Sequence, residues 1–146
     1  MRISSKTEYG VRALFDLAQH YGKGPVQSED IAGRQGIPVN YLNQMLITLR
    51  RAGFIESLRG PQGGHMLARS PEQINLYDVL CVLEGNLVIQ DNARDDLNPT
   101  QPEDCQYVRN VWDDLRRIVE STLLDVTLED LCQRKRQGTG FTMYYI

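Results

Sequence analysis

A glycine-rich tip between two short β-prone runs constrains the fold of this chain more than any other feature. The segment 54–68, FIESLRGPQGGHMLA, places that tip at residues 59–64. Pro61 lacks a backbone N–H and the glycines around it suit sharp or left-handed backbone, so the tip cannot be helical. The segment is therefore predicted to be a β-hairpin. It directly follows a helix-like stretch, NYLNQMLITLRRA. A helix followed by a hairpin that carries an arginine is typical of a winged helix-turn-helix.

Apolar spacing and capping residues predict three helices before the hairpin. Ser5–Glu8 has a capping-box pattern at the start of a helix that ends near His20. A short second helix begins at a cap at Ser28 and ends at Gly36, and a third runs from about Val39 to Ala52. The tight turn between the second and third helices predicts a helix-turn-helix, with the third as recognition helix.

Three more helices are predicted after the hairpin. The helix Leu76–Glu84 is apolar nearly all round, which favours burial, with Cys81 as a small core residue. A long helix begins at about Pro102, and Thr127 caps a last helix that ends near Arg136.

The predicted fold class is mainly α with a small β-hairpin wing. We expect a winged helix-turn-helix DNA-binding domain at residues 1–85 and an acidic loop at 86–104. A dimerisation helix and C-terminal segment follow at 105–146.

The charge distribution favours a nucleic-acid partner for the first half of the chain. The net charge is −3, but residues 1–70 carry nine Lys/Arg and five Asp/Glu, a net +4. Residues 71–146 carry seven Lys/Arg and fourteen Asp/Glu, a net −7, and should face away from phosphate. No apolar run is long enough to span a membrane and the N-terminus lacks the apolar core of a signal peptide, so we expect a cytoplasmic protein.

The predicted recognition helix carries side chains suited to DNA. Asn and Gln can pair with adenine edges, and Tyr can reach a phosphate. The alternative is that these polar residues simply form the solvent-exposed face of the helix. That interpretation is less favoured because a predicted wing that carries an arginine follows the helix directly. The candidates on the helix are Asn40, Tyr41, Asn43 and Gln44 for base or phosphate contact and Arg50 and Arg51 for the backbone.

An apolar stripe in the long second-half helix predicts a homodimer. Its members recur at spacings of three and four residues: Val108, Val111, Trp112, Leu115, Ile118, Val119 and Thr122. The stripe could pack inside the monomer or against its own copy in a two-fold dimer. The dimer is favoured because a single small DNA-binding domain contacts too few bases for specific binding.

The motifs IAGRQGI, YLNQ, LRRAGFI and RGPQGG, taken together, resemble the Rrf-two (Rrf2) family of bacterial winged-helix regulators. The resemblance covers Met1 to about Leu83 and resumes at Cys105–Leu131. It implies homodimers that bind double-stranded operator DNA. It also implies that the N-terminus and the wing contact DNA. The residues that complete the expected contact set are Arg2, Ser4, Ser5, Lys6, Ser28, Arg59, Gly60, Pro61, Gln62 and Gly63.

The chain departs from the family at the position of its metal sensor. Cluster-binding members carry three cysteines before the dimer helix, because thiolates suit iron. Here Cys105 alone matches, and residues 90–104 contain neither Cys nor His. We therefore expect no metal or other cofactor. An atypical iron–sulfur cluster would have to use Cys105 and Glu8 across the dimer interface, and His20 and His65 are expected at the surface rather than as ligands.

Other readings of the sensor region remain open. The acidic residues Asp91, Asp95, Asp96, Glu103 and Asp104 could hold a hard cation or could simply be solvated. Cys105 begins a helix, where a lowered pKa would favour a redox-active thiolate, but an inert thiol is an equal alternative. The signal could also be sensed through an effector molecule or protein that binds between the dimer helix and the DNA-binding domain.

The predicted function is a homodimeric transcriptional regulator, and specifically a repressor. The alternative is a protein-interaction regulator whose DNA binding is residual. An enzyme is disfavoured because no nucleophile–base pair or metal motif is present, and RGPQGG lacks the Lys-Ser/Thr of a phosphate-binding loop.

Overall fold

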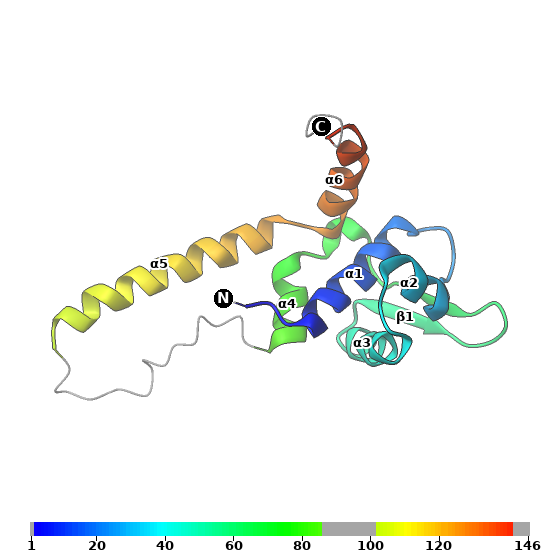
Figure 1. The fold of residues 1–146 in the computed structure, drawn as a ribbon, viewed down its shortest axis with the longest axis horizontal. Helices are drawn as coiled ribbons and strands as arrows, with labels where there is room; N and C mark the ends of the chain where they lie inside the picture. The colour runs from blue at the N-terminus through cyan, green and yellow to red at the C-terminus, as the bar shows by residue number, and fades with distance from the viewer. Residues whose placement is uncertain (1, 86–101, 142–146) are drawn as a thin grey trace.

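The computed structural model describes residues 2–85 and 102–141, which form a helical body with one hairpin and one long projecting helix (Figure 1). The helices are α1 (Ser5–Gln19), α2 (Ser28–Gln35), α3 (Val39–Arg51), α4 (Leu76–Glu84), α5 (Asp104–Asp125) and α6 (Leu128–Phe141), with a 3-10 turn η1 (Pro71–Gln73). The strands are β1 (Ile55–Leu58) and β2 (Gly64–Leu67). The predicted mainly helical winged fold is thus confirmed. None of the described helices has the length and hydrophobicity needed to cross a membrane.

The core forms where helices α1, α2 and α3 meet. In α3 the buried residues Leu42, Met45, Leu46 and Leu49 recur at spacings of three and four, so they share one face of the helix. Leu14 of α1 and Ile31 of α2 are fully buried in the same cluster. Because the inner face of α3 is used for the core, its outer face is left for solvent or a partner.

The hairpin is a two-stranded antiparallel sheet that is tied to the loop before α2. Ile55 pairs with Leu67 and Leu58 with Gly64. Val26 extends the pairing, because its N–H donates to His65 O at 2.8 Å and its carbonyl accepts from His65 N at 2.7 Å. Gly64 has φ +151°, and a Cβ there would lie 2.5 Å from the Val26 carbonyl oxygen. Only glycine allows this close approach of the two backbones.

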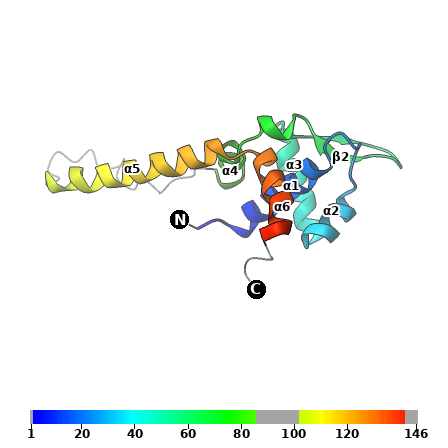
Figure 2. The same cartoon turned by 90° about the horizontal axis from the view of Figure 1, so that it is seen from above.

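Helix α5 projects away from the body, on the side opposite the hairpin (Figures 1 and 2). None of its residues is buried. The chain then returns to the body through α6, whose Leu128 and Cys132 join the core.

The structure corrects several local predictions. The N-cap of α1 is Ser4 rather than Ser5, because its hydroxyl accepts from Thr7 N. The N-cap of α2 is Gln27 without a side-chain bond, so Ser28 is the first helical residue and not the cap. Cys81 is half-buried rather than a core residue, since this side of α4 faces outward from the core.

Candidate nucleic-acid interface

The outer face of α3 holds the predicted recognition residues. All six of them are exposed: Asn40, Tyr41, Asn43, Gln44, Arg50 and Arg51. They are exposed because the apolar residues between them occupy the core face of the same helix. The exposed amides therefore lie in the leading turns of the helix and the two arginines in its last turn.

Helix α1 supports the tyrosine on the recognition helix. The rings of Tyr9 and Tyr41 lie 6.2 Å apart in a tilted arrangement, and the guanidinium of Arg12 lies 5.0 Å from the Tyr9 ring centroid. Tilted aromatic pairs and cation–π contacts at these distances are favourable. The sequence shows Tyr9 only as one member of the apolar pattern of the first helix, so its contact with Tyr41 could not be predicted.

The wing tip presents the other group of predicted contacts. Arg59, Gly60, Pro61 and Gln62 are exposed. Gly63, which belongs to the predicted set, is instead buried. A Cβ there would lie 2.1 Å from the Leu58 carbonyl oxygen, so Gly63 closes the tip and does not face outward with the others.

A cleft separates the wing from the start of α2. It is lined by Gln27, Ser28, Glu29, Leu58, Gly60, Gly63, Gly64 and His65. Gln27 Nε2 donates to the Pro61 carbonyl at 3.5 Å across it. His65, expected at the surface rather than as a ligand, is half-buried, and both of its ring nitrogens are within hydrogen-bond distance of serine hydroxyls.

The N-terminal segment is only partly available to DNA. Arg2, Ser5 and Lys6 are exposed, but Ser4 is half-buried. The backbone N–H and hydroxyl of Ser4 both donate to Glu84 Oε1, at 2.8 and 2.7 Å. Hydrogen bonds from Thr7 and Ser4 lower the pKa of the Glu84 carboxyl. Ser4 therefore joins α1 to the end of α4.

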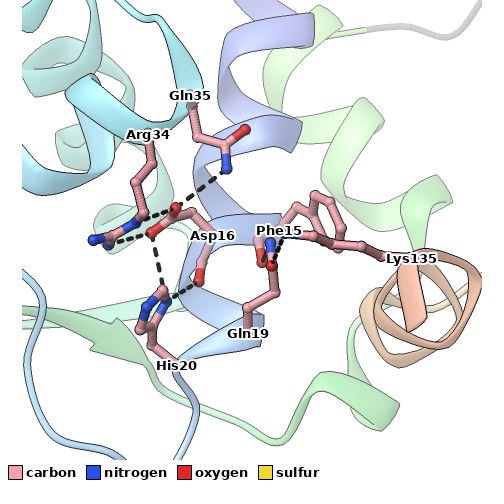
Figure 3. A network of polar contacts seen from close by, with 7 residues as sticks. All are labelled: Phe15, Asp16, Gln19, His20, Arg34, Gln35 and Lys135. Atoms are coloured by element: carbon pink, nitrogen blue, oxygen red, sulfur yellow. Dashed lines mark hydrogen bonds and ion pairs between the residues drawn. The ribbon is translucent and has the colours of Figure 1, made fainter. Parts of the chain in front are cut away.

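A buried carboxylate fixes the first helix of the helix-turn-helix to α1 (Figure 3). Asp16 is 1% exposed and accepts hydrogen bonds from Arg34 Nε at 2.9 Å, from Arg34 Nη2 at 2.8 Å and from Gln35 Nε2 at 3.1 Å. His20 Nδ1 lies 2.8 Å from the Asp16 carbonyl oxygen and 3.7 Å from its carboxylate, so His20 is not a free surface residue. Burial alone would raise the pKa of Asp16, but the hydrogen bonds from Arg34 and Gln35 and the nearby positive charges lower it below its usual value.

The thiol-bearing residues do not form a metal-binding set. Cys81, Cys105 and Cys132 belong to α4, α5 and α6, and burial raises the pKa of Cys132. Glu8 is paired with Arg12 at 3.8 Å, so a cation already lies beside the proposed ligand. Over residues 2–85 and 102–141, no three His, Cys, Asp or Glu side chains lie together as a metal site would require.

Most of the segment predicted to be an acidic loop lies outside the described residues. Asp91, Asp95 and Asp96 are outside the described residues. Glu103 and Asp104 are exposed at the start of α5.

The predicted dimer stripe is an exposed apolar row along α5. Val108, Val111, Trp112, Leu115 and Ile118 are 42–64% exposed. Val119 is half-buried, and the exposed Thr122 donates to the Ile118 carbonyl at 2.8 Å. Tyr107, which the prediction omitted, borders the row at 65% exposure, whereas the exposed Leu124 lies seven residues after Arg117, on the other side of the helix. The stripe therefore does not pack inside the described chain.

Comparisons with known proteins agree with this architecture. Residues 3–134 match the Rrf2 family, described as iron-dependent transcriptional regulators. An HTH-type transcriptional regulator of Synechocystis is 40% identical over 145 residues, which cover 96% of this chain and 97% of that protein. The regulator CymR of Bacillus subtilis is 33% identical over the full length of both chains.

Solved structures of Rrf2-type regulators share the fold of this chain. The structure of CymR, the global cysteine regulator of B. subtilis, superposes with a TM-score of 0.78 at 32% identity and covers 91% of this chain and 97% of that one. That of T. potens IscR superposes with a TM-score of 0.74 at 37% identity, covering 92% and 88%.

Proposed function

This chain belongs to the Rrf2 family of transcriptional regulators, and we propose that it binds operator DNA as a homodimeric repressor. It is a DNA-binding transcriptional regulator and not an enzyme, because the family and its relatives are regulators. In the proposed complex α3 enters the major groove and the hairpin reaches the backbone or minor groove of the same duplex.

The observation that carries the DNA-binding mode is the division of α3 into two faces. Its buried leucines and methionine fix it to the body, and its exposed face carries Asn40, Asn43 and Gln44, whose amides can pair with base edges. Arg59 lies exposed on the hairpin that follows. We assign the operator contacts to these two elements, together with the N-terminal residues Arg2 and Lys6.

The exposed row on α5 supports the homodimer. A row of large apolar side chains at helical spacing loses its contact with water when it pairs with the same row on a second copy. Such a dimer would present two DNA-binding domains to two operator half-sites. The proposed division is then a DNA-binding domain at residues 1–85, an acidic loop at 86–104 and a dimerisation segment at 105–146. A dimer on an operator that overlaps a promoter would exclude RNA polymerase, which makes repression in the cytoplasm the proposed outcome.

Loss of the wing arginine should weaken operator binding and reduce its salt dependence. The operator is first selected from a pool of random duplexes with the purified protein. Arg59→Ala should then lower affinity and reduce the slope of log K against log salt by about one, because one phosphate contact is lost. Gln44→Ala should instead cost about 1–3 kcal/mol and relax preference at one base position.

The matched control is Arg117→Ala, which removes an exposed arginine from α5, the helix that projects away from the body (Figure 1). It should leave affinity and salt slope near the wild-type values. Wild-type affinity and slope in Arg59→Ala would show that the wing assignment is wrong.

The family description implies iron, but the ligand set here does not fit an iron–sulfur cluster. The thiols lie on separate helices, and the candidate carboxylate Glu8 lies 3.8 Å from the guanidinium of Arg12. We infer that the protein senses its signal without the family's cluster. Anaerobic reconstitution with iron and sulfide should leave no stable visible chromophore and no stoichiometric acid-labile sulfide. A stable chromophore that is lost in Cys105→Ala or Glu8→Ala would establish a cluster shared between subunits and overturn this inference.

A further inference from the structure

His65 lies where both strands of the wing meet the start of α2. Its Nδ1 is 2.7 Å from the Ser57 hydroxyl of β1, and its Nε2 is 3.0 Å from the Ser28 hydroxyl of α2. Ser57 is also its cross-strand partner in the hairpin. The ring is rigid and its two nitrogens can bond to different groups, so it is suited to fix the spacing between the groups that it joins.

The backbone of His65 connects the same two regions. It exchanges two hydrogen bonds with Val26, which lies two residues before Ser28. The wing is therefore held at its base by backbone and side chain, while its tip at residues 59–62 is exposed. We therefore expect a change at the base to shift Arg59 relative to α3.

A neutral imidazole suits these contacts. Burial lowers the pKa of His65 below its usual 6.5, the positive charge of Arg50 lowers it further, and the carboxylate of Glu29 opposes them. A neutral ring has one donor and one acceptor nitrogen, and each serine hydroxyl can take the complementary role. Near neutral pH both bonds can therefore form without a buried charge.

We propose that His65 is a positioning residue for DNA binding, which holds the wing through Ser57 and Ser28 at the spacing from α3 that lets both elements contact one duplex. The proposal rests on the proposed function. It requires no contact between the imidazole and DNA. Its distinctive consequence is that Ser57, which is not among the assigned DNA contacts, should influence DNA affinity through His65.

A double-mutant cycle with the full-length protein tests this consequence. The dissociation constant for the selected duplex is measured for wild type, Ser57→Ala, His65→Leu and the double variant. His65→Leu should weaken binding roughly ten-fold, because it removes two hydrogen bonds that each contribute modestly. Ser57→Ala should weaken binding a few-fold alone and have no further effect in the His65→Leu background.

Controls separate positioning from stability. Ser70→Ala, a half-buried serine after the hairpin that makes no capping bond, should bind as wild type. His65→Gln keeps a polar end able to reach Ser28 and should recover part of the affinity. Urea unfolding of each variant gives its folded fraction, and affinities are compared per folded molecule.

The outcomes are distinct. If His65→Leu and Ser57→Ala are less stable but their folded fractions bind as tightly as wild type, His65 is only structural and the proposal is overturned. If His65→Leu does not fold, the Ser57→Ala and His65→Gln affinities decide in the same way. Wild-type protein that binds no selected duplex above background would overturn the proposed function and this proposal together. Imidazole nitrogen NMR shifts that change in Ser57→Ala would still report the hydrogen bond itself, independently of DNA.

Discussion

Replacing Arg34 with methionine should lower the free energy of unfolding by about 3 kcal/mol. The substitution leaves the Asp16 carboxylate, 1% exposed, without its bidentate partner. Breaking a buried pair in this way costs about 3–5 kcal/mol, and the lower end applies because Arg34 itself is 42% exposed. Urea unfolding followed by circular dichroism measures the loss.

The pH dependence of stability gives a second check on this pair. In wild type the folded-state pKa of Asp16 is below its usual 3.8, so its contribution is present above pH 3.8 and is lost as the pH falls through the folded pKa. In Arg34→Met two causes that lower this pKa are lost while burial, which raises it, remains, so the folded-state pKa should be higher than in wild type. The stability that Asp16 adds above pH 3.8 should therefore shrink in the variant, and the difference in unfolding free energy between the two proteins should become smaller as the pH falls and Asp16 is protonated.

Two further variants control the measurement. Asp16→Asn combined with Arg34→Met removes the buried charge and should recover part of the loss. Arg117→Met breaks an exposed pair with Asp114 and should cost less than about 1 kcal/mol. An Arg34→Met protein as stable as wild type between pH 3 and 7 would show that the pair does not join α1 to α2 as the distances indicate.

An aspartate in the exposed row of α5 should convert the proposed dimer to a monomer. Trp112 and Leu115 lie at the middle of the row, and aromatic residues at the centre of an interface carry much of its energy. Trp112→Asp or Leu115→Asp should lower operator affinity about 10²–10⁴-fold, because the two half-sites are no longer bound by two DNA-binding domains joined in one dimer. Sedimentation velocity and binding to the two-half-site duplex measure the two effects.

The position of the charge provides the control. Arg117→Glu introduces the same kind of charge on α5 but away from the row, and it should remain dimeric. Wild-type protein that sediments as a monomer at micromolar concentration, or unaltered dimers in both aspartate variants, would refute the interface.

Local patterns predicted the fold well for a physical reason. The apolar spacing in α3 and the Pro–Gly tip of the hairpin are properties of neighbouring residues, and neighbouring residues determine helix faces and turns. The confirmed end of α4 at Glu84 and the capping of α6 by Thr127 are of this kind. The stripe on α5 was also visible, but periodicity alone could not decide whether its own chain covers it.

The missed features depend on residues distant in sequence. Asp16 pairs with a residue 18 positions away, and Ser4 bonds to one 80 positions away. His65 meets Ser28 at a separation of 37. The sequence offers one faint signal, an aspartate within the otherwise apolar FDLA of α1. The partners of these groups become evident only when the helices are packed, so the sequence could name the residues that we propose contact DNA but not the residues that hold them in position.

The contact between Ser4 and Glu84 affects how the N-terminus can meet an anion. The first turn of α1 carries the partial positive charge of a helix N-terminus, which would attract a DNA phosphate. That place is already taken by the carboxylate of Glu84, whose oxygen accepts both Ser4 donors. An approaching phosphate would therefore be repelled by Glu84 at the helix end itself. In the proposed complex the attraction of this end of the molecule for DNA therefore falls to the side chains of Arg2 and Lys6. A glutamine at position 84 could still accept both Ser4 hydrogen bonds through its amide oxygen, but it would remove the negative charge that repels a phosphate from the helix end.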